Sequence, residues 1–157
     1  MAEIVAAAWA LARADGLAAL SMRELGKRVG MRAQSIYSYF GSKNEIYDAM
    51  FLEGYTAFGD HMAAAADTAP FASDPVGAAT AMARAYVDFC TTDPARYQLL
   101  FQRPVPDFIP SERSYAVAVA SYTQMERQLA TIGVRGQDEL DLWTAMLTGL
   151  TSQQLSN

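Results

Sequence analysis

The chain has 157 residues, of which 52% are hydrophobic, and a formal net charge of -5 at pH 7. This length and composition predict one folded domain or two small ones, and they exclude a disordered chain. A single cysteine, Cys90, excludes an intramolecular disulfide, and with the single histidine, His61, it excludes a zinc site built from these residue types, so we expect no metal and no cofactor.

Apolar residues at helical spacing predict a first helix over residues 2–14, which Gly16 ends. The segment is as apolar as a signal peptide, but Glu3 stands where such a peptide carries cations. No apolar run in the sequence reaches membrane-spanning length. We therefore expect a cytoplasmic protein without a membrane partner.

A short second helix is predicted from Ser21 to Val29. Its start matches a capping box, in which the Ser21 hydroxyl accepts the N–H of Glu24 and the Glu24 carboxylate reaches back. Gly26 supplies the small residue that a close crossing with the next helix requires, and Gly30 allows a left-handed turn. Two short helices joined in this way predict a helix-turn-helix.

The third helix, predicted over residues 33–40, carries different residue types on its two sides. At about 100° per residue, Ala33, Ile36 and Phe40 fall on one apolar side. The opposite side and its flanks carry Gln34, Ser35, Ser38, Tyr37 and Tyr39. This outward face offers hydrogen-bonding groups without formal charge, which suits the base edges in a DNA major groove.

The rest of the chain is predicted to be helical, with two proline-containing loops. A second capping box, Ser42 to Glu45, opens a longer helix that ends near Ala66. Prolines predict loops at residues 67–75 and 103–110. The further predicted helices are a fifth that ends before Thr91, a sixth over 95–101, a seventh over 111–132 and an eighth after Gly136.

No segment alternates like a strand, so we expect an all-α fold. A helix-turn-helix unit at residues 1–49 is joined to a larger helical body at residues 50–157. From Ser21 to Lys43 there are five cations and one acid, whereas residues 51–157 hold six cations and twelve acids. A local basic face can attract phosphate because distant charges are screened, although charge alone fits a solvated surface equally well.

The segment AALSMRELGKRVGMRAQSIYSYFGSKNEIYDAMF resembles the DNA-binding region of the TetR family of bacterial transcriptional repressors. The family pattern is a Ser or Thr opening the second helix, a small residue, a glycine turn, an aliphatic-Tyr-x-aromatic-Phe run and then Ser-Lys. Its positions in this chain are Ser21, Gly26, Gly30, Ile36, Tyr37, Tyr39, Phe40, Ser42 and Lys43.

The resemblance implies roles for these residues on double-stranded DNA. Tyr37 and Lys43 would contact phosphates, and Ser21 with its helix N-terminus would touch the DNA backbone. The residues that would face the major groove are Gln34, Ser35, Ser38 and Tyr39. Two departures bear on operator preference: Arg32 stands where the family usually has Ser or Thr, and Tyr39 stands where histidine is common.

The larger helices carry many aromatic and methionine side chains, and core packing explains most of them. Inward-facing tyrosines also suit an apolar pocket with polar anchors, and the resemblance implies that this body binds a small effector. The residues expected around a mostly apolar effector are Tyr86, Phe89, Phe101, Tyr115, Tyr122, Met125 and Trp143, with Tyr86, Tyr115 and Tyr122 on inward faces. We expect His61 at the surface or between helices, and Cys90 in the core.

The resemblance implies a repressor that binds a near-palindromic operator as a homodimer and is released by its effector. The family pairs subunits through its last two helices, so we expect this chain either to lack residues at its C-terminal end or to dimerise differently. A helical protein-interaction module without DNA binding is the alternative. No nucleophile, base and orienting group are arranged for catalysis, so we do not expect an enzyme.

Overall fold

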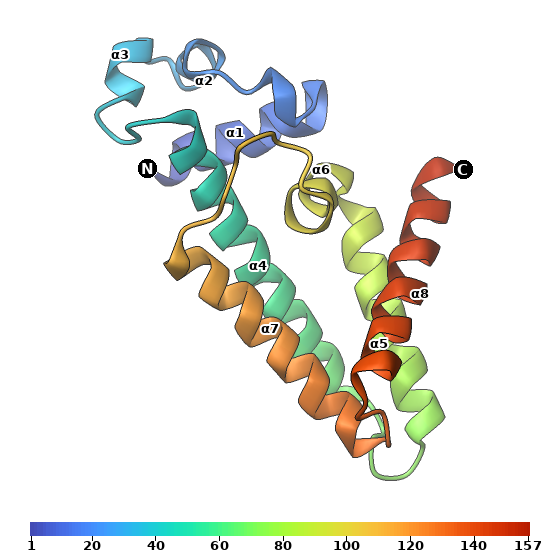
Figure 1. Cartoon of the computed structure of the whole chain (residues 1–157). Coiled ribbons are helices and arrows are strands. Elements are labelled where there is room, and N and C mark those ends of the chain that lie inside the picture. The colour runs from blue at the N-terminus through green and yellow to red at the C-terminus, as the bar shows by residue number, and fades with distance from the viewer. The chain divides into compact units, whose positions relative to one another are not determined.

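A computed structural model describes all 157 residues, and every regular element in it is a helix (Figure 1). The predicted all-α fold class is therefore confirmed. In chain order the elements are α1 (Ala2–Asp15), the 3₁₀ turn η1 (Leu17–Ala19), α2 (Met22–Val29), α3 (Ala33–Ile36), α4 (Lys43–Thr68), α5 (Pro75–Thr92), α6 (Pro94–Tyr97), the π-helical segment η2 (Gln98–Gln102), α7 (Glu112–Thr131) and α8 (Gln137–Ser156).

The helices form two compact units that do not follow chain order. The first unit consists of Met1–Gly54 and Asp93–Ala116, and the second of Tyr55–Thr92 and Val117–Asn157. The helices α4 and α7 each contribute residues to both units. The domain boundary predicted at residue 49 separates a DNA-binding part from an effector-binding part. This functional division stays a prediction.

One hydrophobic core holds the first unit together. Its buried members are Ile4, Val5, Ala8, Trp9, Leu11, Ala12, Leu17, Leu20, Met22, Leu25, Ile36, Phe40, Ile46, Tyr47, Met50, Ala95 and Leu99. Ala95 lies on α6 and Leu99 on η2, so these two elements share the core of the N-terminal helices. Burial of this much apolar surface is the main force that holds the unit together.

A buried carboxylate joins α1 to α6. The Nε of Arg13 donates to Oδ2 of Asp93 at 2.9 Å, and a terminal guanidinium nitrogen lies 2.8 Å from the same oxygen. Oδ1 of Asp93 accepts the backbone N–H of Arg96 at 3.2 Å, which caps α6. Asp93 therefore begins one helix and anchors another to it.

A second carboxylate joins α4 to the start of α7. Oδ1 of Asp48 accepts the backbone N–H of Ser111 at 2.7 Å, and Oδ2 accepts the hydroxyls of Ser111 and Ser114 at 2.9 Å each. In the preceding loop, the ring of Phe108 packs against those of Tyr47 and Phe51 on α4. The proline-rich segment is the loop predicted from the sequence, and these contacts attach it to the first unit.

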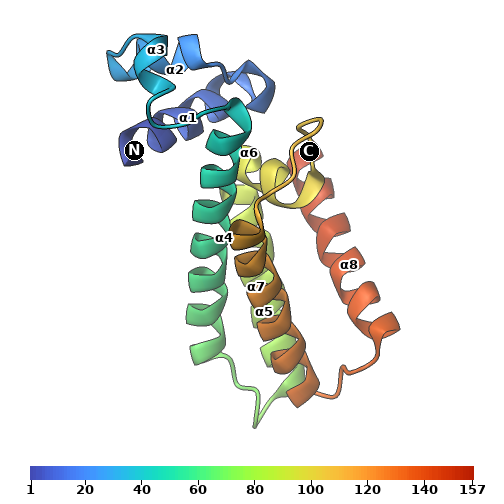
Figure 2. The same cartoon turned by 60° about the vertical axis from the view of Figure 1, so that its left-hand side comes forward.

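Helix pairs build the second unit. α8 packs on α5, and its buried residues, Leu140, Leu147 and Thr151, recur at helical spacing. The part of α4 after Tyr55 runs beside α7 in both views (Figures 1 and 2). At this contact, a Cβ added to Gly59 would lie 3.3 Å from Oγ of Ser121.

Two predicted helices differ from the observed ones. The third ends at Ile36 rather than at residue 40, because Ser38 and Tyr39 donate to carbonyls three residues back, at 3.3 Å and 2.9 Å, and so tighten the chain into turns. The predicted sixth helix over 95–101 divides into the single α-helical turn α6 and the π-helical segment η2. Apolar spacing cannot distinguish such variants, because they bury nearly the same side chains.

The chain entering α3 crosses α2 at Gly26. A Cβ on Gly26 would lie 2.6 Å from the carbonyl oxygen of Met31, a backbone atom that cannot rotate away. We expect Gly26→Ala to lower the free energy of unfolding by about 1–3 kcal/mol in urea denaturation, because the overpacked helices must move apart.

Gly149→Ala on α8 is the matched control, since nothing lies within 4 Å of the added Cβ. We expect this variant to be more stable than wild type by about 0.5–1 kcal/mol. Equal stability of wild type and Gly26→Ala would contradict the close crossing.

Candidate nucleic-acid interface

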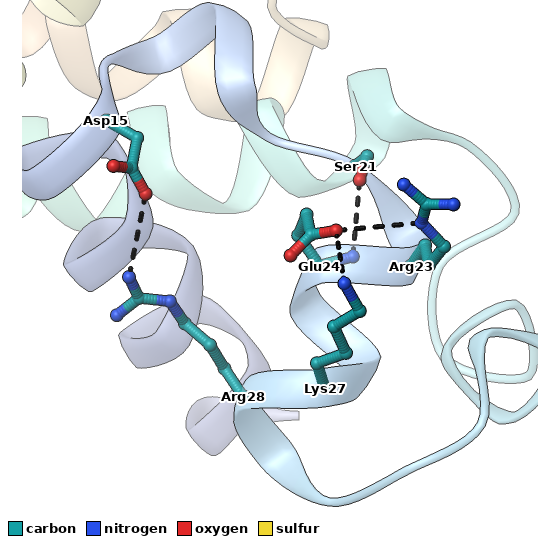
Figure 3. Close-up of polar contacts among 6 residues, drawn as sticks. All are labelled: Asp15, Ser21, Arg23, Glu24, Lys27 and Arg28. Carbon is teal, nitrogen blue, oxygen red and sulfur yellow. Dashed lines mark hydrogen bonds and ion pairs between the residues drawn. The ribbon is translucent and has the colours of Figure 1, made fainter.

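Ser21 begins the second helix as the sequence predicts, but only one arm of the capping box forms. Its hydroxyl accepts the backbone N–H of Glu24 at 3.2 Å. The Glu24 carboxylate does not reach back and instead meets two cations (Figure 3). Nζ of Lys27 lies 2.9 Å and Nε of Arg23 lies 3.6 Å from its Oε1.

These ion pairs neutralise part of the positive charge of residues 21–43, the basic segment. The hydrogen bond from Lys27 holds the pKa of the Glu24 carboxyl below its usual range, with smaller contributions from the charges of Lys27 and Arg23. On the other side of α2, a guanidinium nitrogen of Arg28 lies 3.7 Å from Oδ2 of Asp15 (Figure 3). All of these side chains are substantially exposed, so each pair contributes little to stability.

The turn between α2 and α3 has the predicted left-handed geometry. Gly30 has φ 69° and ψ 25°, a conformation that glycine adopts without the strain a side chain would cause. The N–H groups of Gly30 and Met31 both donate to the carbonyl of Gly26, the latter at 2.8 Å. The turn is thus held against the helix that it leaves.

The two sides of the predicted third helix are where the sequence places them. Ile36 and Phe40 are buried and Ala33 is half-buried. On the outward side, Gln34 and Ser38 are exposed, Tyr37 and Tyr39 are 50% and 48% exposed, and Ser35 is half-buried. The early end of α3 leaves this division intact, because residues 37–40 continue in turns of similar curvature.

The start of α4 follows the second capping box with one shift. Oγ of Ser42 accepts the N–H of Glu45 at 3.2 Å, while the Glu45 carboxylate accepts the N–H of Gly41 at 2.8 Å rather than that of Ser42. Nζ of Lys43 lies 5.3 Å from the ring centroid of Tyr47, whose hydroxyl donates to the carbonyl of Leu17 at 2.6 Å. The ammonium group is thus held at the beginning of α4.

Arg32 occupies the N-cap position of α3 without capping it. Its side chain makes no capping hydrogen bond, and it is exposed. Arg32 therefore does not supply the cap that a Ser or Thr at this position could provide.

The expected effector residues are divided between the two units. Phe101 and Tyr115 belong to the first unit, and Tyr86, Phe89, Tyr122, Met125 and Trp143 belong to the second. Phe101, Met125 and Trp143 are half-buried.

Within the second unit, Tyr86 and Phe89 do come together, through a residue that the sequence analysis missed. The ring of Phe58 on α4 lies 6.0 Å from that of Tyr86 and 5.2 Å from that of Phe89. Phe58 falls in a helix that carries apolar residues on several sides, so periodicity did not single it out.

The predicted inward orientation is wrong for two of the three tyrosines. Tyr115 is 51% exposed and Tyr122 is 39% exposed, although Leu129 lies on the same side of α7 and is buried. This side of α7 is thus covered only toward its C-terminal end. Tyr86, the third, is half-buried. The expected role of these tyrosines at an effector stays a prediction.

The expectations for His61 and Cys90 are confirmed. Nε2 of His61 lies 3.0 Å from the carbonyl oxygen of Ala85, and its ring centroid lies 5.4 Å from that of Phe89, so it is a contact between α4 and α5. Cys90 is fully buried.

A groove of about 760 Å³ runs between the end of α4 and the start of α5. Its lining residues are His61, Ala64, Ala65, Thr68, Asp74, Val76, Gly77, Thr80, Ala81, Arg84, Ala85 and Asp88. None of the expected effector residues is among them. No helix of the chain combines the length and the apolar character that crossing a membrane requires.

Comparisons with known proteins agree with the geometry of the first unit. The model of the family described as bacterial regulatory proteins, tetR family, matches residues 4–50. HTH-type transcriptional regulators of Mycobacterium bovis and Mycobacterium tuberculosis are each 31% identical over 132 residues, or 80% of this chain. That match spans 55% of each relative, so the chain covers about half the length of these regulators.

Solved structures share the fold at low sequence identity. A Rhodococcus sp. RHA1 protein of unknown function has a TM-score of 0.82 at 18% identity, covering 99% of this chain and 82% of that one. The TetR family transcriptional regulator PfmR from Thermus thermophilus has a TM-score of 0.66 at 21% identity, covering 95% of this chain and 84% of that one.

Proposed function

This chain belongs to the TetR family of bacterial transcriptional regulators, and we propose that it is a cytoplasmic repressor that binds a near-palindromic operator in double-stranded DNA. The observation that carries the proposal is the exposed, uncharged, hydrogen-bonding face of residues 34–39, which a buried apolar side holds against the first unit. Five cations lie in the same part of the sequence, between Ser21 and Lys43.

The proposed division of contacts follows from charge. Phosphates attract cations whatever the base sequence, so Lys43, with Tyr37 and Ser21 as hydrogen-bonding neighbours, would position the protein on the DNA backbone. Base edges require neutral donors and acceptors, and an amide such as that of Gln34 can pair with adenine. The other side chains proposed to face the groove are Ser35, Ser38 and Tyr39.

Two variants separate backbone contacts from base contacts. We expect Lys43→Ala to weaken binding to all sequences and to reduce the slope of log K against log salt by about 0.9 per subunit. Gln34→Ala should change the preferred base at one position and leave that slope unchanged. Fluorescence anisotropy on a site obtained by in vitro selection measures both effects.

Arg127→Ala is the control for a lost cation, because Arg127 is exposed on α7, outside the basic segment. If Lys43→Ala and Gln34→Ala both bind the selected site like wild type, the proposed interface is wrong. The alternative, a helical protein-interaction module without DNA binding, would then be favoured, since it requires neither Lys43 nor Tyr37.

We further propose that the protein is a homodimer. Support comes from exposed apolar residues at helical spacing on two helices of the second unit, Val119 and Tyr122 on α7 and Leu142, Met146 and Leu150 on α8. Exposed apolar side chains that recur on one side of a helix are candidates for an interaction site. In a dimer, the recognition segments, residues 33–40 of each subunit, would fit successive turns of the major groove if they lie about 34–36 Å apart.

We expect Met146→Glu to shift the protein from dimer to monomer in sedimentation velocity experiments. A carboxylate on the apolar stripe of α8, formed by Leu142, Met146 and Leu150, would lose its hydration at the interface without gaining a partner. Thr148→Glu is the matched control: Thr148 is exposed on the same helix but lies off the stripe. A dimer that both variants leave intact would place the interface elsewhere.

The proposed effector is small and mostly apolar. Support comes from the contacts of Tyr86 and Phe89 with Phe58, which gather aromatic rings from α4 and α5. An effector that binds one dimer arrangement better than another shifts the population toward it, and release follows if that arrangement no longer spans two grooves. As a continuous helix from Lys43 to Thr68, α4 is the proposed transmitter.

A thermal-shift screen with apolar aromatic compounds tests the effector proposal. We expect hits that raise the melting temperature and weaken binding to the selected DNA. Tyr86→Phe, which keeps the ring and removes the hydroxyl, should weaken hits that carry a polar group. A screen without any hit, or hits that leave DNA affinity unchanged, would contradict the proposal.

A further inference from the structure

The Arg32 side chain makes no hydrogen bond that stabilises the start of α3. The backbone of Arg32 is extended, with φ -69° and ψ 145°, and its carbonyl accepts the N–H of Ser35, three residues on, at 2.8 Å. The side chain at this position normally accepts a backbone N–H, as Ser21 does for α2. A guanidinium has donors only, so Arg32 cannot make this bond.

The other cations of the basic segment have partners. Arg23 and Lys27 pair with Glu24, and Arg28 pairs with Asp15 (Figure 3). Lys43 lies over the ring of Tyr47. Arg32 differs from all four, because its guanidinium makes no hydrogen bond, ion pair or ring contact and is exposed to solvent.

A residue that departs from a local rule without a compensating contact is expected at a functional position. Arg32 lies directly before the recognition segment, two residues from Gln34. In helix-turn-helix complexes, residues at the start of the second helix contact base edges. The planar fork of arginine matches the O6 and N7 acceptors of guanine, which neutral groups such as the serine hydroxyls recognise less selectively.

We propose that Arg32 determines sequence specificity by binding a guanine base edge in each operator half-site. This inference rests on the proposed DNA-binding function and adds the base and the residue that recognises it. A phosphate contact would use the same charge, but it would raise affinity for every sequence equally. Base preference and salt dependence therefore distinguish the two roles.

In vitro selection with wild type and Arg32→Ser tests the inference. We expect wild type to select guanine at one symmetric position of each half-site, and Arg32→Ser to lose that preference while keeping the others. Replacing this guanine should cost wild type about tenfold in affinity and leave Arg32→Ser nearly unchanged. Arg32→Lys keeps the charge but lacks the fork, so it should recover affinity without full discrimination.

Arg32→Ser also has a readout that does not depend on DNA. Serine can cap α3, so the variant should melt at or above the temperature of wild type, which excludes unfolding as the cause of altered binding. Arg23→Ser is the matched control. It removes an exposed cation that has a partner in Glu24, and it should leave every base preference in place.

Two outcomes would overturn the inference. An equal loss of affinity by Arg32→Ser on all sequences, with a smaller salt slope, would show a phosphate contact only. Identical base preferences of wild type and Arg32→Ser would show that Arg32 has no role in specificity. Both outcomes leave the proposed function standing, whereas failure of wild type to select any site would contradict the proposed function itself.

Discussion

The absence of a side chain at Gly26 is the constraint on which the first unit depends. Because Gly26 occupies so little space, the turn after α2 lies directly on that helix, and its carbonyl accepts the N–H of Met31 at 2.8 Å. This contact sets the direction in which α3 leaves the turn. That direction turns Ile36 toward the core and Gln34 toward solvent, so the character of the exposed face follows from one close backbone approach.

The first unit also includes a segment that is distant in sequence. Asp93 accepts from Arg13, and Asp48 accepts from Ser111 and Ser114, so two carboxylates attach Asp93–Ala116 to the N-terminal helices. The helices α4 and α7 then continue from this unit into the second. For the proposed effector response, these two helices are continuous covalent routes by which a change in the second unit would reach the first.

Much of the candidate interface could be predicted from short-range patterns. The Ser21 and Ser42 caps, the glycine turn and the two-sided recognition segment involve residues a few positions apart, whose geometry depends on local backbone chemistry. Details that depend on competing partners could not be predicted in this way. Glu24 bonds Lys27 rather than closing its box, and α3 ends early because tighter turns take over its hydrogen bonds.

The sequence by itself determined the helical class, the positions of most helices and the residues of the recognition segment, because periodicity and capping act over one or two turns. Only the tertiary structure decided which apolar faces are covered. It placed α6 and η2 in the core of the first unit, and it left Tyr115 and Tyr122 exposed on α7. An apolar stripe has the same sequence pattern whether it meets a core, a ligand or another chain, and only the packing of distant segments distinguishes these cases.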